Sequence, residues 1–166
     1  PPGTTTTRST TLGQATAITL PQAEHIATTL GELATPCLVL DADRMERNIA
    51  RLKARLDRLG VPLRPHLKTS KSVDVARRVL TSPSGPATVS TLLEAEQFAA
   101  AGVRDIVYAV GIAPSKLPQV LALRAGGADV TVVLDTLEEA QAVALAWRQA
   151  GARIPPRFEI DCVGHR

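Results

Sequence analysis

The stretch PLRPHLK (residues 62–68) decides between the two folds that the rest of the chain allows. Read as a β-strand, it places its three basic side chains on one face and its apolar side chains on the other. A strand of a (β/α)8 barrel shows this pattern near its carboxyl end, where the inner face opens into a site and the outer face packs under helices. The stretch therefore favours a barrel over an open doubly wound sheet. The three basic residues are Arg64, His66 and Lys68.

Short apolar strands alternate with helices along most of the chain. Because the alternation has a short period, the sheet is predicted to be parallel. No Gly-x-Gly-x-x-Gly sequence follows any predicted strand, so the dinucleotide-binding fingerprint of many doubly wound sheets is missing. The predicted strands are residues 37–40, 62–68, 87–91, 105–110, 129–135 and 157–162, and the predicted helices are residues 43–59, 72–81, 92–101, 115–125 and 136–150.

Particular residues are expected to begin and end the helices. Asp43 with Glu46, and Thr136 with Glu139, have the spacing of a capping box. Ser115 can cap the helix that follows it. Glycines close three helices, where a left-handed residue is expected: Gly60, Gly102 and Gly151.

The composition excludes several classes of function. The net charge is only +3 and 2% of the residues are aromatic, so nucleic-acid binding has little support. No apolar run approaches the roughly 18 residues that span a membrane, and no signal-peptide pattern begins the chain. A cytoplasmic location is therefore expected. Cys37 and Cys162 make neither a disulfide framework nor a zinc site, and Cys37 is expected in the core.

The chain divides into a tail and an organised region. Residues 1–20 are predicted to be a disordered tail, because threonine-rich sequence without periodicity opens the chain. Residues 21–166 are predicted to form the N-terminal part of the barrel, preceded by a short helix at residues 21–33. A complete barrel takes roughly 200 residues or more, and this chain ends just after residues 157–162, the fifth barrel strand when the count begins at residues 62–68. We expect a fragment of a longer protein, with completion by partners as the alternative.

Lys68 has the chemistry of a nucleophile if the basic face lines a barrel mouth. Positive neighbours and partial desolvation lower the pKa of a lysine, and a neutral lysine forms an imine with a carbonyl compound. Pyridoxal phosphate is such a carbonyl cofactor, and its phosphate favours positive surroundings. The alternative is a solvated basic rim, with Lys68 extended into water and Arg64 paired with an acid.

Five blocks of sequence resemble, in order and spacing, one enzyme family. They resemble the N-terminal part of the D-threonine aldolase and D-serine dehydratase family, whose members are fold-type III pyridoxal-phosphate enzymes related to alanine racemase. The resemblance covers residues 35–166, and YAVGIAPSKL looks more like the aldolase branch. The blocks are TPCLVLD (35–41), RPHLKTSKS (64–72), ATVSTLLEAEQFAAAG (87–102), DIVYAVGIAPSKL (105–117) and FEIDCVGHR (158–166).

The resemblance assigns roles to several residues near the cofactor. Lys68 matches the Schiff-base lysine, with Lys71 as the competing candidate. Arg64 and His66 match positions that flank the Schiff base, where they would tune Lys68 and contact cofactor or substrate. Arg166 matches an arginine that faces the cofactor ring.

Three further positions have a simpler alternative. Thr91 and Glu94 match the family at the start of a helix, and Thr91 is taken as a cofactor-binding candidate, although helix capping explains both about as well. His165 and His25 are expected to be surface histidines.

The implied function is that of a lyase acting on small D-amino acids. The resemblance implies cleavage of D-3-hydroxy amino acids such as D-threonine into glycine and an aldehyde. Dehydration of D-serine is the alternative reaction. Two alternatives without catalysis are a carrier of pyridoxal phosphate and a folded remnant that binds no ligand. The family also implies a divalent metal in a C-terminal β-domain, and its ligands are not in this chain. A homodimer or a monomer is expected, without nucleic acid or membrane.

Overall fold

The computed structural model describes residues 29–162 and residue 164, which fall into two compact units, Pro1–Val39 and Leu40–Arg166. In the described part of the first unit, the regular element is a short 3-10 turn, η1 (Leu30–Glu32). Of the helix predicted at residues 21–33, residues 21–28 lie outside the described residues, and η1 lies within the remainder. The predicted tail, residues 1–20, lies outside the described residues.

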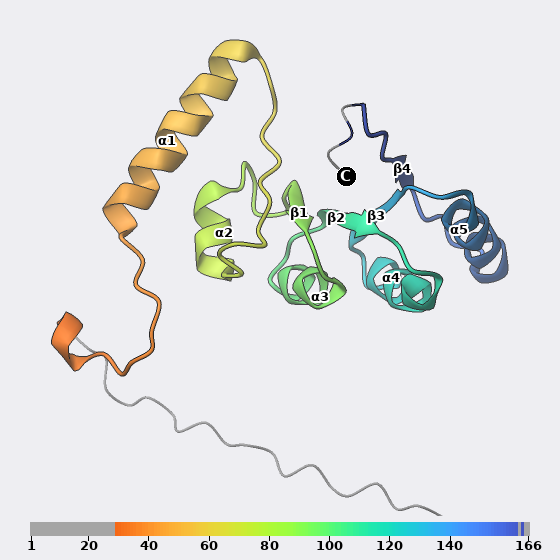
Figure 1. The fold of residues 1–166 in the computed structure, drawn as a ribbon, viewed down its shortest axis with the longest axis horizontal. Helices are drawn as coiled ribbons and strands as arrows, with labels where there is room; N and C mark the ends of the chain where they lie inside the picture. Colours follow the sequence, from red (N-terminus) through yellow and green to blue (C-terminus); the bar gives the residue numbers. More distant parts are fainter. Residues whose placement is uncertain (1–28, 163, 165–166) are drawn as a thin grey trace, which may run out of the picture. The chain divides into compact units, whose positions relative to one another are not determined.

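The second unit contains a parallel sheet whose strands follow one another in sequence order. The strands are β1 (Ala87–Val89), β2 (Asp105–Gly111), β3 (Asp129–Leu134) and β4 (Pro156–Phe158), and the helices between them are α3 (Leu92–Ala100), α4 (Leu117–Ala125) and α5 (Leu137–Ala150). The three helices lie on one side of the sheet (Figure 1). Because crossovers are right-handed, sequential strands place all helices on one face, as in a barrel wall. The predicted parallel α/β architecture is confirmed.

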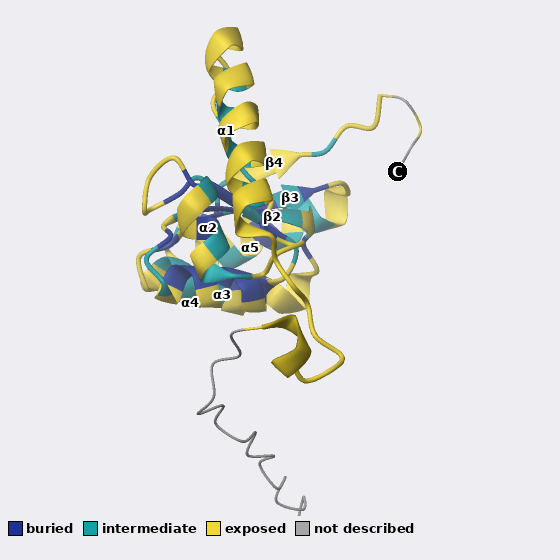
Figure 2. Ribbon diagram, turned by 90° about the vertical axis from the view of Figure 1, so that its left-hand side faces the viewer, coloured by how far each residue is buried: buried dark blue, intermediate teal, exposed yellow. Residues whose placement is uncertain are grey.

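The core lies between this sheet and its helices. In-register residues form rows across the sheet, and the row Val89, Tyr108 and Val132 is fully buried. Apolar side chains from the helices, such as Phe98 and Val120, complete the core from the other side. Figure 2 shows the buried residues concentrated in these layers. Strands buried in this way carry runs of Val and Ile, which explains why the sequence pattern predicted them well.

The strand predicted at residues 62–68 is not formed: His66 makes an isolated bridge, and Leu67 and Lys68 already belong to the turn that follows. The contact of this stretch with the sheet is one parallel bridge between His66 and Thr88. The Leu67 N–H donates to the Thr88 oxygen, and the Thr88 N–H donates to the Pro65 oxygen, each over 2.9 Å. Pro65 has no N–H for the next rung, and neither has Pro86 on the facing segment. The two prolines therefore prevent a longer ladder.

The predicted strand at residues 37–40 is wrong, and so is the buried position of Cys37. The segment has no strand geometry, and Cys37 is exposed. Leu38, Val39 and Leu40 are also exposed. An apolar strand is buried only where another surface covers it, and no described residue covers this one.

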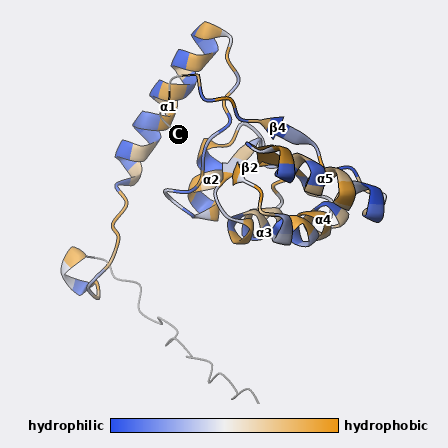
Figure 3. Cartoon of the chain, turned by 45° about the vertical axis from the view of Figure 1, so that its right-hand side comes forward, coloured by the Kyte–Doolittle hydropathy of each residue, from blue (hydrophilic) through white to orange (hydrophobic). Residues whose placement is uncertain are grey.

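The first helix of the second unit, α1 (Ala42–Leu59), begins earlier than its predicted capping box. Asp41, not Asp43, accepts the Arg44 N–H over 2.8 Å, and Gly60 ends the helix in the left-handed conformation as predicted. No residue of α1 is buried, although apolar and polar residues alternate along the helix (Figure 3). An ion pair of 2.6 Å links Glu46 to the next helix, α2 (Val73–Val79).

Two other predicted boundaries also differ from the structure. A 3-10 turn, η2 (Pro114–Lys116), precedes α4, and no side chain caps the first turn of α4. The prediction that Ser115 caps this helix is therefore wrong. The last predicted strand, residues 157–162, is shortened to β4.

Candidate active site

The carboxyl end of β1 brings two turns together, and Lys68 lies in one of them. Leu67 is buried and anchors this turn, because its N–H binds Thr88 and its carbonyl oxygen accepts the Lys71 N–H over 3.0 Å. The neighbouring Lys68 is exposed. Turns at the carboxyl ends of parallel strands are where active sites lie in folds of this kind.

Lys68 differs from the other lysines of the chain in having a free amine. Lys53 donates to two backbone carbonyl oxygens, Lys71 pairs with Glu94, and Lys116 donates to the Tyr108 hydroxyl over 2.9 Å. The Lys68 Nζ makes no hydrogen bond or ion pair with any residue that the structure describes. It is therefore available to an incoming carbonyl group.

His66 lies directly beside Lys68 and is held in one tautomer. Its Nδ1 accepts the backbone N–H of Lys68 over 3.3 Å, so the proton of the neutral ring is on Nε2, which faces the Ser90 hydroxyl oxygen at 3.5 Å. Partial burial and the charge of Lys68 lower the pKa of His66, against the opposing charge of Glu94. The ring is therefore neutral near pH 7, with an N–H donor on the Ser90 side.

Glu94 provides a buried negative charge beneath these groups. Its carboxylate accepts the Ser90 N–H over 2.9 Å, and the Lys71 ammonium lies 3.3 Å away. Burial alone would raise the pKa of Glu94, but the Ser90 N–H, the Lys71 ammonium and the Thr91 N–H hold it below its ordinary value. The Thr91 hydroxyl accepts the Glu94 N–H over 3.1 Å, which is the helix cap that the simpler interpretation predicts.

Arg64 lies away from this cluster, at the amino ends of the strands. Its guanidinium binds both carboxylate oxygens of Asp105 over 2.8 and 2.7 Å, and the carbonyl oxygen of Ala87 over 3.2 Å. Asp105 and Ala87 are the first residues of β2 and β1. Arg64 thus has the acidic partner that the alternative interpretation gave it, and its contact with a cofactor remains a prediction.

The remaining predicted positions are only partly placed. Arg166, His165 and His25 lie outside the described residues. Sequence reasoning missed Ser90 as a partner of His66 and Glu94 as the partner of Lys71. The Thr-x-x-Glu spacing of Thr91 and Glu94 was the available signal for a structured turn at this place.

A hollow of about 670 Å³ lies at the carboxyl ends of β2, β3 and β4. Its lining includes Asp135, Glu159 and Asp161. A Cβ at Gly111 would approach the Glu139 carboxylate to 2.9 Å, so that side chain would have to shift to make room for it. Among the described residues, no group of three or more acidic, histidine or cysteine side chains is arranged to hold a metal ion.

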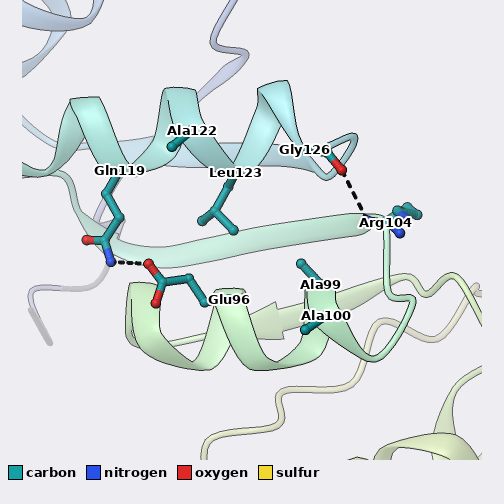
Figure 4. Close-up of a pocket in the computed structure, with 8 residues that line it drawn as sticks. All are labelled: Glu96, Ala99, Ala100, Arg104, Gln119, Ala122, Leu123 and Gly126. Atoms are coloured by element: carbon teal, nitrogen blue, oxygen red, sulfur yellow. Dashed lines mark hydrogen bonds between the residues drawn. The ribbon is translucent and has the colours of Figure 1, made fainter.

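A groove of about 460 Å³ lies on the outer, helical side of the fold between α3 and α4. Figure 4 shows Glu96 and Gln119 joined at one end and Arg104 bonded to the carbonyl oxygen of Gly126 at the other. Small side chains form its floor, and none of the predicted site residues lines it.

In the described part of the chain, no helix has both the length and the apolar character needed to cross a membrane.

Sequential parallel strands with their helices on one side are the arrangement found in the wall of an α/β barrel. Residues 40–166 match the alanine racemase N-terminal domain, and the chain belongs to this family. The resemblance inferred from the five sequence blocks is thereby confirmed.

Three relatives illustrate the branch of the family that the chain is similar to. D-threo-3-hydroxyaspartate dehydratase of Delftia sp. (strain HT23) is 52% identical over 138 residues, which cover 83% of this chain and 36% of that protein. The 3-hydroxy-D-aspartate aldolase of Paracoccus denitrificans is 34% identical over 134 residues (79% and 34%). The D-threonine aldolase of Arthrobacter sp. is 34% identical over 145 residues (87% and 38%). The chain thus spans about a third of the length of these relatives.

Solved structures agree with this placement. The Delftia dehydratase superimposes with a TM-score of 0.78 at 52% identity, over 81% of this chain and 36% of that one. An alanine racemase-like protein from Idiomarina loihiensis superimposes with a TM-score of 0.73 at 47% identity, over 75% and 33%.

Proposed function

We propose that this chain is the cofactor-lysine part of a pyridoxal-phosphate-dependent lyase acting on a D-3-hydroxy amino acid. The observation that carries the proposal is the free amine of Lys68, since the other three lysines all have partners in the structure. The relatives, which are named for reactions of 3-hydroxy-D-aspartate, D-threonine and D-serine, support the substrate class.

The residues around Lys68 fit a carbonyl cofactor. Lys68 would hold it through Nζ. The imidazole of His66 beside it is neutral, so it adds no second positive charge next to Lys68. When bound, pyridoxal phosphate supplies a conjugated ring that accepts the electrons of a bond broken at the substrate Cα. The amine of Lys68, once free, is a base that can take a proton near that carbon. A metal, which the family resemblance implies, is assigned to no residue of this chain.

Dehydration is the reaction that we propose first. The dehydratase relative is 52% identical, whereas the two aldolase relatives are 34% identical. Aldol cleavage of D-threonine or a related substrate is the second candidate, favoured by the aldolase-like YAVGIAPSKL segment (residues 108–117).

Attachment of the cofactor is tested on the 166-residue chain itself. We expect pyridoxal phosphate to give an absorbance band near roughly 420 nm. Borohydride should then fix the cofactor on the peptide that carries Lys68, as peptide mass spectrometry would show. Lys68→Ala should lose both signals, whereas the matched control Lys53→Ala should keep them. A band and adduct that persist in Lys68→Ala would refute the assignment.

The reaction is tested with one substrate whose products differ by pathway. D-threo-3-Hydroxyaspartate would yield oxaloacetate and ammonia by dehydration, but glycine and glyoxylate by aldol cleavage. We expect oxaloacetate from a full-length protein that contains this chain, and none from its Lys68→Ala variant. Glyoxylate in place of oxaloacetate would support the aldolase candidate, and a Lys68 adduct without either product would indicate a carrier.

A further inference from the structure

The turn that carries Lys68 ends in a residue with unusual backbone geometry. Lys71 has a φ of +46° and is the one non-glycine residue with a positive φ in the described part of the chain. Glycine adopts this left-handed conformation without steric strain, whereas a residue with a Cβ does not. A lysine at such a position indicates that its side chain makes an interaction that glycine could not replace.

That interaction is the ion pair with Glu94. The Lys71 Nζ lies 3.3 Å from Glu94 Oε1, and the Glu94 side chain is only 7% exposed. Oε1 accepts no hydrogen bond from any described residue, whereas Oε2 accepts the Ser90 N–H. Leaving a buried carboxylate without a cation is strongly unfavourable. Lys71 is therefore the charge that balances Glu94.

The ion pair joins the two turns that surround Lys68. On one side, the Lys71 N–H donates to the carbonyl oxygen of Leu67 and closes the turn that contains Lys68. On the other side, His66 accepts the Lys68 N–H and faces the hydroxyl of Ser90. The backbone of Lys68 is thus held from both directions, while its amine stays free.

We propose that Lys71 and Glu94 are positioning residues for Lys68. Their ion pair holds the left-handed turn against the turn between β1 and α3, and this fixes the place at which the Lys68 amine meets pyridoxal phosphate. The inference rests on the proposed role of Lys68 and adds to it the two residues that set its position.

The test compares the labelling of Lys68 with that of Lys53 in the same protein. The 166-residue chain is mixed with pyridoxal phosphate, reduced with borohydride at short times and digested, and peptide mass spectrometry gives the ratio of the two adducts. We expect Lys71→Met and Glu94→Gln each to lower this ratio by about ten- to a hundredfold, because small displacements of a reacting group have effects of that order. The conservative Lys71→Arg, which keeps the ion pair, should restore most of it.

Lys71→Gly separates positioning from simple stability. Glycine removes the backbone strain, so this variant should melt at or above the temperature of Lys71→Met while its labelling ratio stays low. The double variant Lys71→Met with Glu94→Gln should be no worse than either single variant, because both break the same pair.

The outcomes distinguish this inference from the proposed function. If Lys68 is labelled selectively in the unchanged protein and equally selectively in Lys71→Gly and Glu94→Gln, the positioning role is refuted and the role of Lys68 stands. If Lys68 is labelled no faster than Lys53 in the unchanged protein, the proposed role of Lys68 is refuted, and the positioning role with it.

Discussion

Two basic residues of one short stretch differ completely in their surroundings. Arg64 is bound to Asp105, whereas Lys68, four residues later, has a free amine. Alternating polar and apolar residues predict which face of a strand a side chain lies on, but not which end of the sheet it lies near. Arg64 lies at the amino ends of the strands, whereas Lys68 lies in the turn that follows the bridge at His66. The alternation pattern therefore could not predict their separate environments.

The Arg64–Asp105 pair should stabilise the amino end of the sheet. Lysine cannot make two parallel hydrogen bonds to one carboxylate, so Arg64→Lys is expected to lower the free energy of unfolding by about 1 kcal/mol, a modest value because the pair is partly exposed. Urea unfolding followed by circular dichroism measures this. Arg77→Lys, at the exposed pair with Asp74, is the matched control and should change stability by less than about 0.5 kcal/mol. Equal effects of the two substitutions would contradict the prediction.

Glu94 should make stability depend on pH in the acid range. Its folded pKa lies below the ordinary value of 4.5, so its stabilisation is present above that pH and is lost as the pH falls through the folded pKa. Glu94→Gln should be less stable than the unchanged chain near neutral pH, and the difference should shrink below about pH 4.5. Unfolding free energies measured across this range test the prediction. A difference that is constant with pH would show that the carboxylate charge is not involved.

Helix starts differ in whether a side chain caps them. The Thr136 hydroxyl accepts the Glu139 N–H over 3.2 Å, as the capping-box spacing predicted, whereas Ser115 caps nothing because a 3-10 turn precedes α4. Thr136→Ala should therefore lower the free energy of unfolding by about 1 kcal/mol. Ser115→Ala should leave it nearly unchanged. Urea midpoints of both variants test this, and an equal loss at the two positions would contradict the assignment of the caps.

The elements that the sequence predicted well are those with local causes. Capping residues, turn glycines and buried Val and Ile runs fix α5, β2 and β3 within a residue or two. The errors occur where distant partners decide the outcome. Residues 37–40 have strand-like side chains but no covering surface among the described residues, and residues 62–68 contain prolines that interrupt pairing.

The candidate site could be predicted only in part for a similar reason. The proximity of His66 and Lys68 could be predicted, because the two residues are only two positions apart in the sequence. The contacts of Lys71 with Glu94 and of His66 with Ser90 join segments more than twenty residues apart, and a single sequence carries little signal for such pairs. The roles of Arg64, Thr91 and Arg166 toward a cofactor remain predictions.

At the scale of the whole sheet, β4 is an edge strand of the described sheet and carries one large exposed apolar side chain. Phe158 is 71% exposed on this strand. Because an edge strand also offers unpaired backbone groups, we expect the chain to self-associate through it. Phe158→Glu should reduce association in sedimentation velocity more than Leu137→Glu, which alters an equally exposed residue (70%) on α5. Association that responds equally to both substitutions would point away from the strand edge.

The sequential order of the strands also bears on how the chain forms during its synthesis. Each of β2, β3 and β4 pairs with the strand that was made immediately before it. A growing chain with this order never has to wait for a distant segment or displace an earlier strand, so each strand and helix can dock as soon as it leaves the ribosome. The turn that contains Lys68 meets its partners at β1 and α3, and so it is completed within the first of these steps, before the rest of the sheet exists.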